Sequence, residues 1–452
     1  MIGFVKKQPF LFIISLSSVF FYLSFAYDLQ RTDFPKLIML YGALFFFFYK
    51  IVQIAKNNFA FLTLLAVLFR LIFLLATPNL SQDYFRFIWD GRMVAEGLNP
   101  YLTSPQNFIR SGIYPIAQAE ELYRGMGELN GSHYTVYPPL NQFVFLLSSL
   151  LSNSIFGAVA WMRFILIFAD LGTLYFGKKI LERLQLPTHH IFWFLINPFI
   201  IIEMTGNLHF EGMMICLLLW GFYLILSGKW KAAAVLFGFS ASVKLISLIF
   251  IPIIFNYLGW KKFLVFGSLA GLSFGLLYLP FLSGELLTFY FTSLTMYFNN
   301  FEFNASIFYI IRWIGYQSKG YNIIRTFGMI APFVVLGIVL AIAFFRKNKT
   351  FQQVVVSMLL AISVYYFTAT VVHPWYVAVL LILSIFTRFR YPLVWTLVVM
   401  FSYFAYSNPD FKENFWLLAI EYGMVYSWFI YELFFVRKER SFIQMDKSLK
   451  VL

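Results

Sequence analysis

Residues 81–101 read SQDYFRFIWDGRMVAEGLNPY, and they form the most polar stretch of a chain that is otherwise largely apolar. Asp83, Arg86 and Asp90 follow one another at i, i+3 and i+7, a spacing that places them on one face of a helix. Phe and Trp side chains fall largely on the other face. A helix with aromatic residues opposite its charges is typical of a membrane surface, so this stretch predicts an interfacial helix that ends at Asn99-Pro100.

The alternative interpretation of this stretch is a solvated loop that only links two membrane helices. The aromatic face and the closely spaced charges argue against that alternative, and so do the polar motifs found later in the chain.

The composition indicates a membrane protein. Of the 452 residues 61% are hydrophobic and only 12% are charged, whereas a soluble protein carries about 25% charged residues. Apolar runs such as LFIISLSSVFFYLSFAY at residues 11–27 show none of the period-two alternation of a transmembrane barrel. Since a membrane helix needs about 20 apolar residues, the runs predict an all-α polytopic protein with about 11–14 transmembrane helices.

The charges predict how the chain is oriented in the membrane. The formal net charge is +14, and in a membrane protein such an excess mostly reflects basic cytoplasmic loops. No basic cluster lies on a soluble domain, so binding of nucleic acid is not expected. Lys6, Lys7, Lys50 and Lys56 flank the first two apolar runs, and by this count residues 78–138 face the exterior or lumen.

The cysteine content and the amino terminus give little further information about the fold. Cys216 is the single cysteine and lies in an apolar run, so no disulfide can form within the chain. The first apolar run lacks a small-residue cleavage site, so a cleavable signal peptide is not expected. No repeat or separate soluble domain is evident, and residues 1–452 are expected to form a single integral membrane domain.

Polar residues interrupt the apolar chain in four places. The four constellations are the Asp83 segment, Tyr134–Gln142 with its rigid Tyr137-Pro138-Pro139, Asn207–Glu211, and His373-Pro374-Trp375-Tyr376. Lys244 is an isolated addition in the apolar run 232–257, which also contains Pro252 and could be a broken pair of half-helices. Ionisable residues at membrane depth are costly and by default mark a functional site.

Each of these motifs alone has a structural explanation. A single His at a helix end is mostly just interfacial, Trp375 and Tyr376 could belong to an aromatic belt, and Lys244 could extend to the surface. Their joint occurrence at helix ends is harder to explain in this way, because isolated burial of polar groups is costly. We therefore expect His209, Glu211, Lys244 and His373 to converge near Asp83.

The residue types in these motifs suit glycosyl transfer from a lipid phosphate. A carboxylate at the water boundary can act as general base on a hydroxyl group. His, Lys and Arg side chains can stabilise a phosphate leaving group, and Tyr and Trp rings can stack on a sugar. The combination predicts a site for an anionic, lipid-linked sugar substrate.

At these residues the chain resembles the GT-C glycosyltransferases, and among them the mannosyltransferases that include the first GPI mannosyltransferase. The resemblance rests on Asp83-Tyr84, Asp90, Arg92 and the Gly97–Tyr101 sequence GLNPY. The return to the membrane through Tyr137-Pro138-Pro139-Leu140 is similar to the Tyr-x-Pro-Leu sequence of that group.

Two further motifs extend the resemblance. Asn207–Glu211 is similar to the His-Phe-Gln turn of the dolichol-linked glucosyltransferases, and His373 stands where such enzymes place a phosphate-contacting His. The GPI-type enzymes carry an Asp-x-Asp at the start, whereas Ser81-Gln82-Asp83 keeps only the second Asp. No metal site and no cofactor are predicted.

The resemblance implies a GT-C-like bundle in which residues 78–138 form an exoplasmic catalytic loop with an interfacial helix. It implies inverting transfer of a sugar, here mannose, from a polyprenyl-phosphate donor to a lipid or glycan acceptor on the exoplasmic side. Asp83 is the expected base; Asp90 is the alternative, or a partner that orients Arg92 or Arg86. The residues expected to bind substrate are Arg86, Arg92, Tyr137, His209, Glu211, Lys244, His373, Trp375 and Tyr376.

A bacterial plasma membrane is the expected location, because Phe, Ile, Lys and Asn are abundant. The alternative function is a transporter or flippase of lipid-linked sugars, but such proteins show internal repeats and charges near the bilayer midplane. A polysaccharide polymerase or ligase would need a large late external loop with Arg and His, and the 283–305 loop has neither.

Overall fold

The computed structural model of the protein describes residues 8–436, and in that range it contains helices but no strand. A single parallel bridge joins Phe303 to Val371. In hydrocarbon every backbone polar group must be paired within the protein, and helices achieve this locally. The prediction of an all-α membrane protein is confirmed.

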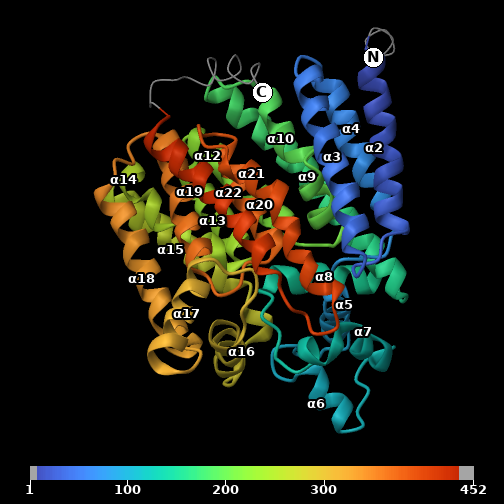
Figure 1. Ribbon diagram of the computed structural model, residues 1–452. Coiled ribbons are helices and arrows are strands. Elements are labelled where there is room, and N and C mark those ends of the chain that lie inside the picture. Colours follow the sequence, from blue (N-terminus) through green and yellow to red (C-terminus); the bar gives the residue numbers. More distant parts are fainter. Residues whose placement is uncertain (1–7, 437–452) are drawn as a thin grey trace.

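The first three helices run along one side of the molecule, drawn in blue in Figure 1. They are α2 (Pro9–Tyr27), α3 (Phe34–Ala55) and α4 (Phe59–Phe73). Local sequence sets their starts: the Asp33 side chain accepts a hydrogen bond from the Lys36 amide, and Asn58 does the same for Phe61.

The polar stretch of the sequence forms three helices at one end of the molecule, the end that also holds α16 and α17 (Figure 1). These are α5 (Asp83–Ala95), α6 (Pro105–Arg110) and α7 (Ala119–Gly131), and the chain returns through α8 (Pro139–Leu151). Gly91 allows α5 and α8 to touch, because a Cβ there would lie 2.3 Å from the carbonyl oxygen of Phe145.

The helix predicted at Asp83 is present as α5. Helices α7 and α8 pack against it, and Trp89 and Asp90 are both fully enclosed. An amphipathic pattern distinguishes the two faces of a helix but does not show which other elements cover them. The location of α5 at the membrane interface remains a prediction.

The middle of the chain contains a sharply broken helix pair. After α9 (Ile155–Arg183), η1 (Thr188–Ile191) and α10 (Phe192–Leu195) come α11 (Pro198–Ile200) and the π-helical turn η2 (Ile201–Gly206). Residues Pro198–Gly206 meet α12 (Glu211–Leu226) at 110°.

Arg163 of α9 stabilises this break. Its guanidinium donates to the carbonyls of Thr205 (2.9 Å), Gly206 (2.9 Å) and Leu74 (3.0 Å). Carbonyls at a helix end have no partner within the helix, so a buried cation supplies one. The 207–210 turn follows directly.

A second break occurs where the sequence predicts it. Helix α13 (Trp230–Ala241) ends just before Lys244, and the run continues as η3 (Leu245–Phe250), η4 (Pro252–Ile254) and α14 (Phe255–Leu258). The remaining elements are α15 (Trp260–Leu276), η5 (Leu279–Phe281), α16 (Leu286–Asn300), α17 (Ile307–Lys319), α18 (Ile324–Phe345), α19 (Phe351–Thr368), η6 (Pro374–Tyr376), α20 (Val377–Ser384), α21 (Tyr391–Val398), η7 (Val399–Ser407) and α22 (Phe415–Phe434).

Within residues 8–436, five helices are long and apolar enough to cross a membrane, and the broken pair at 198–226 gives a sixth. Several shorter apolar helices accompany them, among them α4, α8 and α13. Large apolar side chains such as Phe168 and Phe333 point outward, as lipid contact requires. The expected total of transmembrane helices remains a prediction.

Candidate active site

Asp83 is the first residue of α5, and its carboxylate is only lightly engaged. Asn130 Nδ2 lies 3.4 Å from it, and the Asp83 amide donates to Ser81 Oγ at 3.2 Å. Burial raises the pKa of the Asp83 carboxyl, the nearby Lys244 cation lowers it, and Glu211 raises it. The pKa stays above its usual range, so the group is basic for an aspartate.

Asp90, the second predicted carboxylate, is fully enclosed, and both of its oxygens accept hydrogen bonds. Its Oδ1 accepts from Arg86 Nε at 2.8 Å, and its Oδ2 accepts from Gln142 Nε2 at 3.2 Å. Arg86 also donates to the carbonyls of Asn130 (2.9 Å) and His133 (3.0 Å). This pair ties α5 to the 130–133 loop and is closed to a substrate.

Arg92 has a similar structural role at the other end of α5. Its guanidinium donates to the carbonyls of Ala117 (2.6 Å) and Asn153 (2.7 Å) and to the Gln118 side chain (2.8 Å). These contacts tie α5 to the segments before α7 and α9. The structure thus gives both predicted arginines backbone partners, where the sequence suggested substrate contacts.

Lys244 joins two of the polar motifs. Its Nζ lies 3.0 Å from Glu211 Oε1 and 5.6 Å from the centre of the Tyr137 ring. Lys244 stands at the break before η3, and Glu211 opens α12. The two helix breaks of the fold therefore meet at this ion pair, close to Asp83.

Three aromatic rings stack at the fourth motif. Trp375 lies between the two imidazoles, 3.7 Å from the His209 ring and 4.4 Å from the His373 ring, with interplanar angles of 17° and 8°. Tyr376 meets His373 edge-on at 5.5 Å. Burial, and next the charge of Lys244, lower the pKa of His373 to about 3, so this imidazole is neutral at neutral pH.

The structure adds residues that we did not single out from the sequence. Tyr297 of α16 lies 2.9 Å from His133 Nε2, and burial followed by the charge of Asp83 raises the pKa of its phenol. The Arg31 guanidinium lies 4.4 Å above the Tyr406 ring and also lowers the pKa of Asp83.

Glu203 of η2 is a further residue of this kind, and it is fully buried. A single carboxylate within an apolar run could have been noticed by the rule that already selected Lys244. No comparable pattern distinguishes Tyr297 among the many aromatic residues of the chain, or Arg31 in its short polar loop. Among residues 8–436, no group of three or more His, Cys, Asp or Glu side chains could hold a metal ion.

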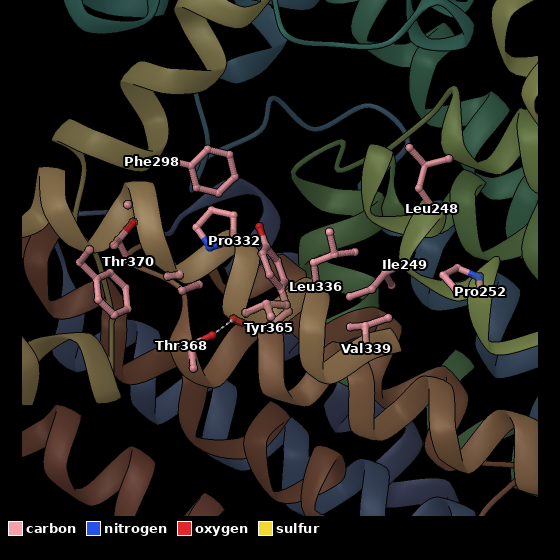
Figure 2. A pocket seen from close by; sticks show the side chains of 15 residues that line it. Leu248, Ile249, Pro252, Phe298, Pro332, Leu336, Val339, Tyr365, Thr368 and Thr370 are labelled. Carbon is pink, nitrogen blue, oxygen red and sulfur yellow. Dashed lines mark hydrogen bonds between the residues drawn. The ribbon is translucent and has the colours of Figure 1, made fainter. Parts of the chain in front are cut away.

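An apolar cavity of about 300 Å³ lies along α18. Figure 2 shows its lining, where Pro332, Leu336 and Val339 of α18 meet Leu248 and Ile249 of η3. Two other lining residues are near site residues in the sequence: Phe298 follows Tyr297, and Thr370 stands three residues before His373.

The segment that carries the first three motifs is similar to known proteins. Residues 36–259 match the family model "Alpha-(1->6)-mannopyranosyltransferase, N-terminal domain". Alpha-(1->6)-mannopyranosyltransferase A of Corynebacterium glutamicum is 25% identical over 198 residues, which make up 42% of this chain and 37% of that relative. These matches confirm the resemblance to GT-C mannosyltransferases.

The two carboxylates can be distinguished by stability. Asp90→Asn leaves the buried Arg86 charge without its counter-ion, which typically costs about 3–5 kcal/mol. Asp83→Asn should leave stability unchanged or raise it, because burial raises the Asp83 pKa and the ionised form is therefore disfavoured in the folded protein. Thermal unfolding in detergent at neutral pH measures both. Equal destabilisation by the two substitutions would contradict these structural assignments.

Proposed function

We propose that the protein is a membrane mannosyltransferase, because residues 36–259 match the model of a mannopyranosyltransferase domain. Its donor is a polyprenyl-phosphate-linked mannose and its acceptor a lipid or glycan hydroxyl. The donor assignment is supported by the apolar cavity along α18 and by a polar site with a cation, two imidazoles and a weakly paired carboxylate.

In this proposal the donor spans the cavity and the polar site. The apolar lining accepts the polyprenyl chain, and the phosphate lies near Lys244 and His373. Lys244 forms an ion pair with Glu211, and neutral His373 can donate one N–H to a phosphate oxygen. Both faces of the Trp375 ring are covered by imidazoles, so its edge, together with the Tyr376 ring 6.1 Å away, is what can contact the sugar.

Asp83 acts as general base in the transfer. The acceptor oxygen attacks the anomeric carbon, its proton passes to the Asp83 carboxylate, and the bond from the anomeric carbon to the phosphate oxygen breaks. Attack opposite the leaving phosphate inverts the configuration. The phosphate leaves with the bonding electron pair and is stabilised by Lys244. Arg86, Asp90 and Arg92 hold the loop that carries the base.

We place the site on the exoplasmic face of a bacterial plasma membrane. The positive charges Lys50 and Lys56 support this orientation, as do Lys229 and Lys231. Lys6, Lys7 and the basic tail with Arg437, Lys438, Arg440 and Lys447 support it from sequence, but they lie outside the described residues.

Labelling of single cysteines in intact cells tests the orientation. In a Cys216→Ala background, Arg110→Cys on exposed α6 should react with a membrane-impermeant maleimide, because α6 belongs to the external loop. Lys229→Cys is also exposed but should react only after permeabilisation. The reverse pattern would invert the topology.

Asp83→Asn tests the base. The amide keeps the size of the side chain but cannot accept the proton, and general base catalysis typically contributes about 10²–10⁴-fold. Transfer of radiolabelled mannose from polyprenyl-phosphate mannose to membrane lipids should fall by that order, while equilibrium binding of the donor persists. Unchanged transfer would remove Asp83 from catalysis and favour a transport function for this loop.

The pH profile provides a check on the same assignment. The base must be ionised, and burial raises its pKa, so kcat/KM should decline on the acid side at a pH above the usual aspartate range. Lys244→Met removes a charge that lowers this pKa, so the decline should move to higher pH. If the acid limb of the pH profile does not move, the group that titrates there is not Asp83.

The cavity is tested by filling it. Ala331→Trp places an indole among the lining residues and leaves less room for the polyprenyl chain. KM for a long-chain polyprenyl-phosphate mannose should therefore rise about tenfold or more. A donor with one or two isoprene units should be little affected. Val334→Trp is the control, since Val334 lies on α18 but faces outward. If both substitutions have equal effects, or if the long and short donors are affected equally, the polyprenyl chain does not bind in this cavity.

A further inference from the structure

Glu203 is a buried carboxylate that the mechanism above does not use. It is 0% exposed, and one oxygen, Oε1, accepts a hydrogen bond from the Tyr403 hydroxyl at 2.7 Å. The other oxygen, Oε2, lies 3.5 Å from His209 Nε2. Among residues 8–436 no Lys or Arg forms an ion pair with Glu203, and the Asn207 side chain also acts on its carboxyl group.

These two atoms have no other partner. Neither Glu203 Oε2 nor His209 Nε2 makes a hydrogen bond with the described residues, and both atoms are closed to solvent. Two enclosed polar atoms that face each other would be costly if both stayed unpaired. One proton held between carboxyl and imidazole satisfies both, and it fixes the plane of the His209 ring.

The fold places Glu203 so that it can act in this way. It lies in the π-helical turn η2, just before the break that Arg163 stabilises, and single π turns are frequent at functional sites. The Glu203 carbonyl also accepts from the His209 amide at 3.3 Å. Both the backbone and the side chain of Glu203 therefore hold His209.

His209 transmits its orientation through aromatic contact. Its ring stacks on Trp375, and Trp375 stacks on His373. The His373 imidazole makes no hydrogen bond with the described residues, and its Nδ1 is enclosed and unpaired. Ring packing from Trp375, Tyr376 and Phe303 is therefore what orients this imidazole.

We propose that Glu203 is a positioning residue that orients His209 and, through the Trp375 ring, His373 toward the phosphate of the donor. This inference rests on the proposed function for the identity of the donor. The order of the ring stack itself does not depend on substrate. Glu203 touches no substrate and takes up no proton from the acceptor; its effect is on donor binding.

Two substitutions with different hydrogen-bonding capacity test the role. Glu203→Met keeps an unbranched side chain of similar length but cannot bond His209, whereas Glu203→Gln can still donate to His209 and accept from Tyr403. The Met variant should raise KM for polyprenyl-phosphate mannose by about 10–100-fold with kcat little changed, the order expected for a misplacement near 1 Å. The Gln variant should recover most of the loss. Equal effects of Met and Gln would overturn the proposal.

A substrate-free measurement separates this inference from the proposed function. In protein labelled with 5-fluorotryptophan, the ¹⁹F resonance of Trp375 is assigned by its loss in Trp375→Phe. Glu203→Met should shift or broaden that resonance and Glu203→Gln should restore it, whether or not any sugar is transferred. His209→Phe keeps a stacked ring without Nε2 and should match the Met variant. An unmoved Trp375 resonance in both the Met and His209→Phe variants would contradict the role assigned to Glu203, even if mannose transfer is demonstrated.

Discussion

The rest of the site depends on the hydrogen bonds of the Arg163 guanidinium. This group donates to three backbone carbonyls that stand at helix ends inside the apolar body of the protein. Because that break is stabilised, the 207–210 turn can exist at this depth. Asn207 in the turn accepts a hydrogen bond from the Leu80 amide at 3.0 Å, three residues before Asp83. One buried cation therefore sets the positions of both the broken helix and the base.

The same constraint separates structural from functional charges. Arg70 and Asp170 pair at 2.7 Å, Arg86 and Asp90 pair at 2.8 Å, and both pairs are enclosed. Removing one partner of such a pair leaves a buried charge unpaired, so these residues stabilise the fold. Asp83 differs, since its weak partners and raised pKa leave the carboxylate available. Burial without full pairing is the condition in which a carboxylate can serve as a base.

Much of this arrangement could be predicted from the sequence, because charge in an apolar run is a strong signal. That rule located the breaks at Asn207–Glu211 and Lys244, and it selected His373. It could not distinguish Asp83 from Asp90, since both share one helix face, and only tertiary packing shows that Asp90 is closed by Arg86 and Gln142. The enclosure of α5 depends on α7 and α8, which no local pattern reveals.

In the mechanism that we propose, the cavity along α18 and the Asp83 site form one continuous donor site. The most direct test is a cryo-electron microscopy structure of the purified protein in nanodiscs with polyprenyl-phosphate mannose and the Asp83→Asn substitution, which should trap the donor. We expect phosphate density near Lys244 and His373, with the isoprenoid chain running past Leu248 and Pro332. Donor density on another face of the molecule, or a chain outside this cavity, would contradict it.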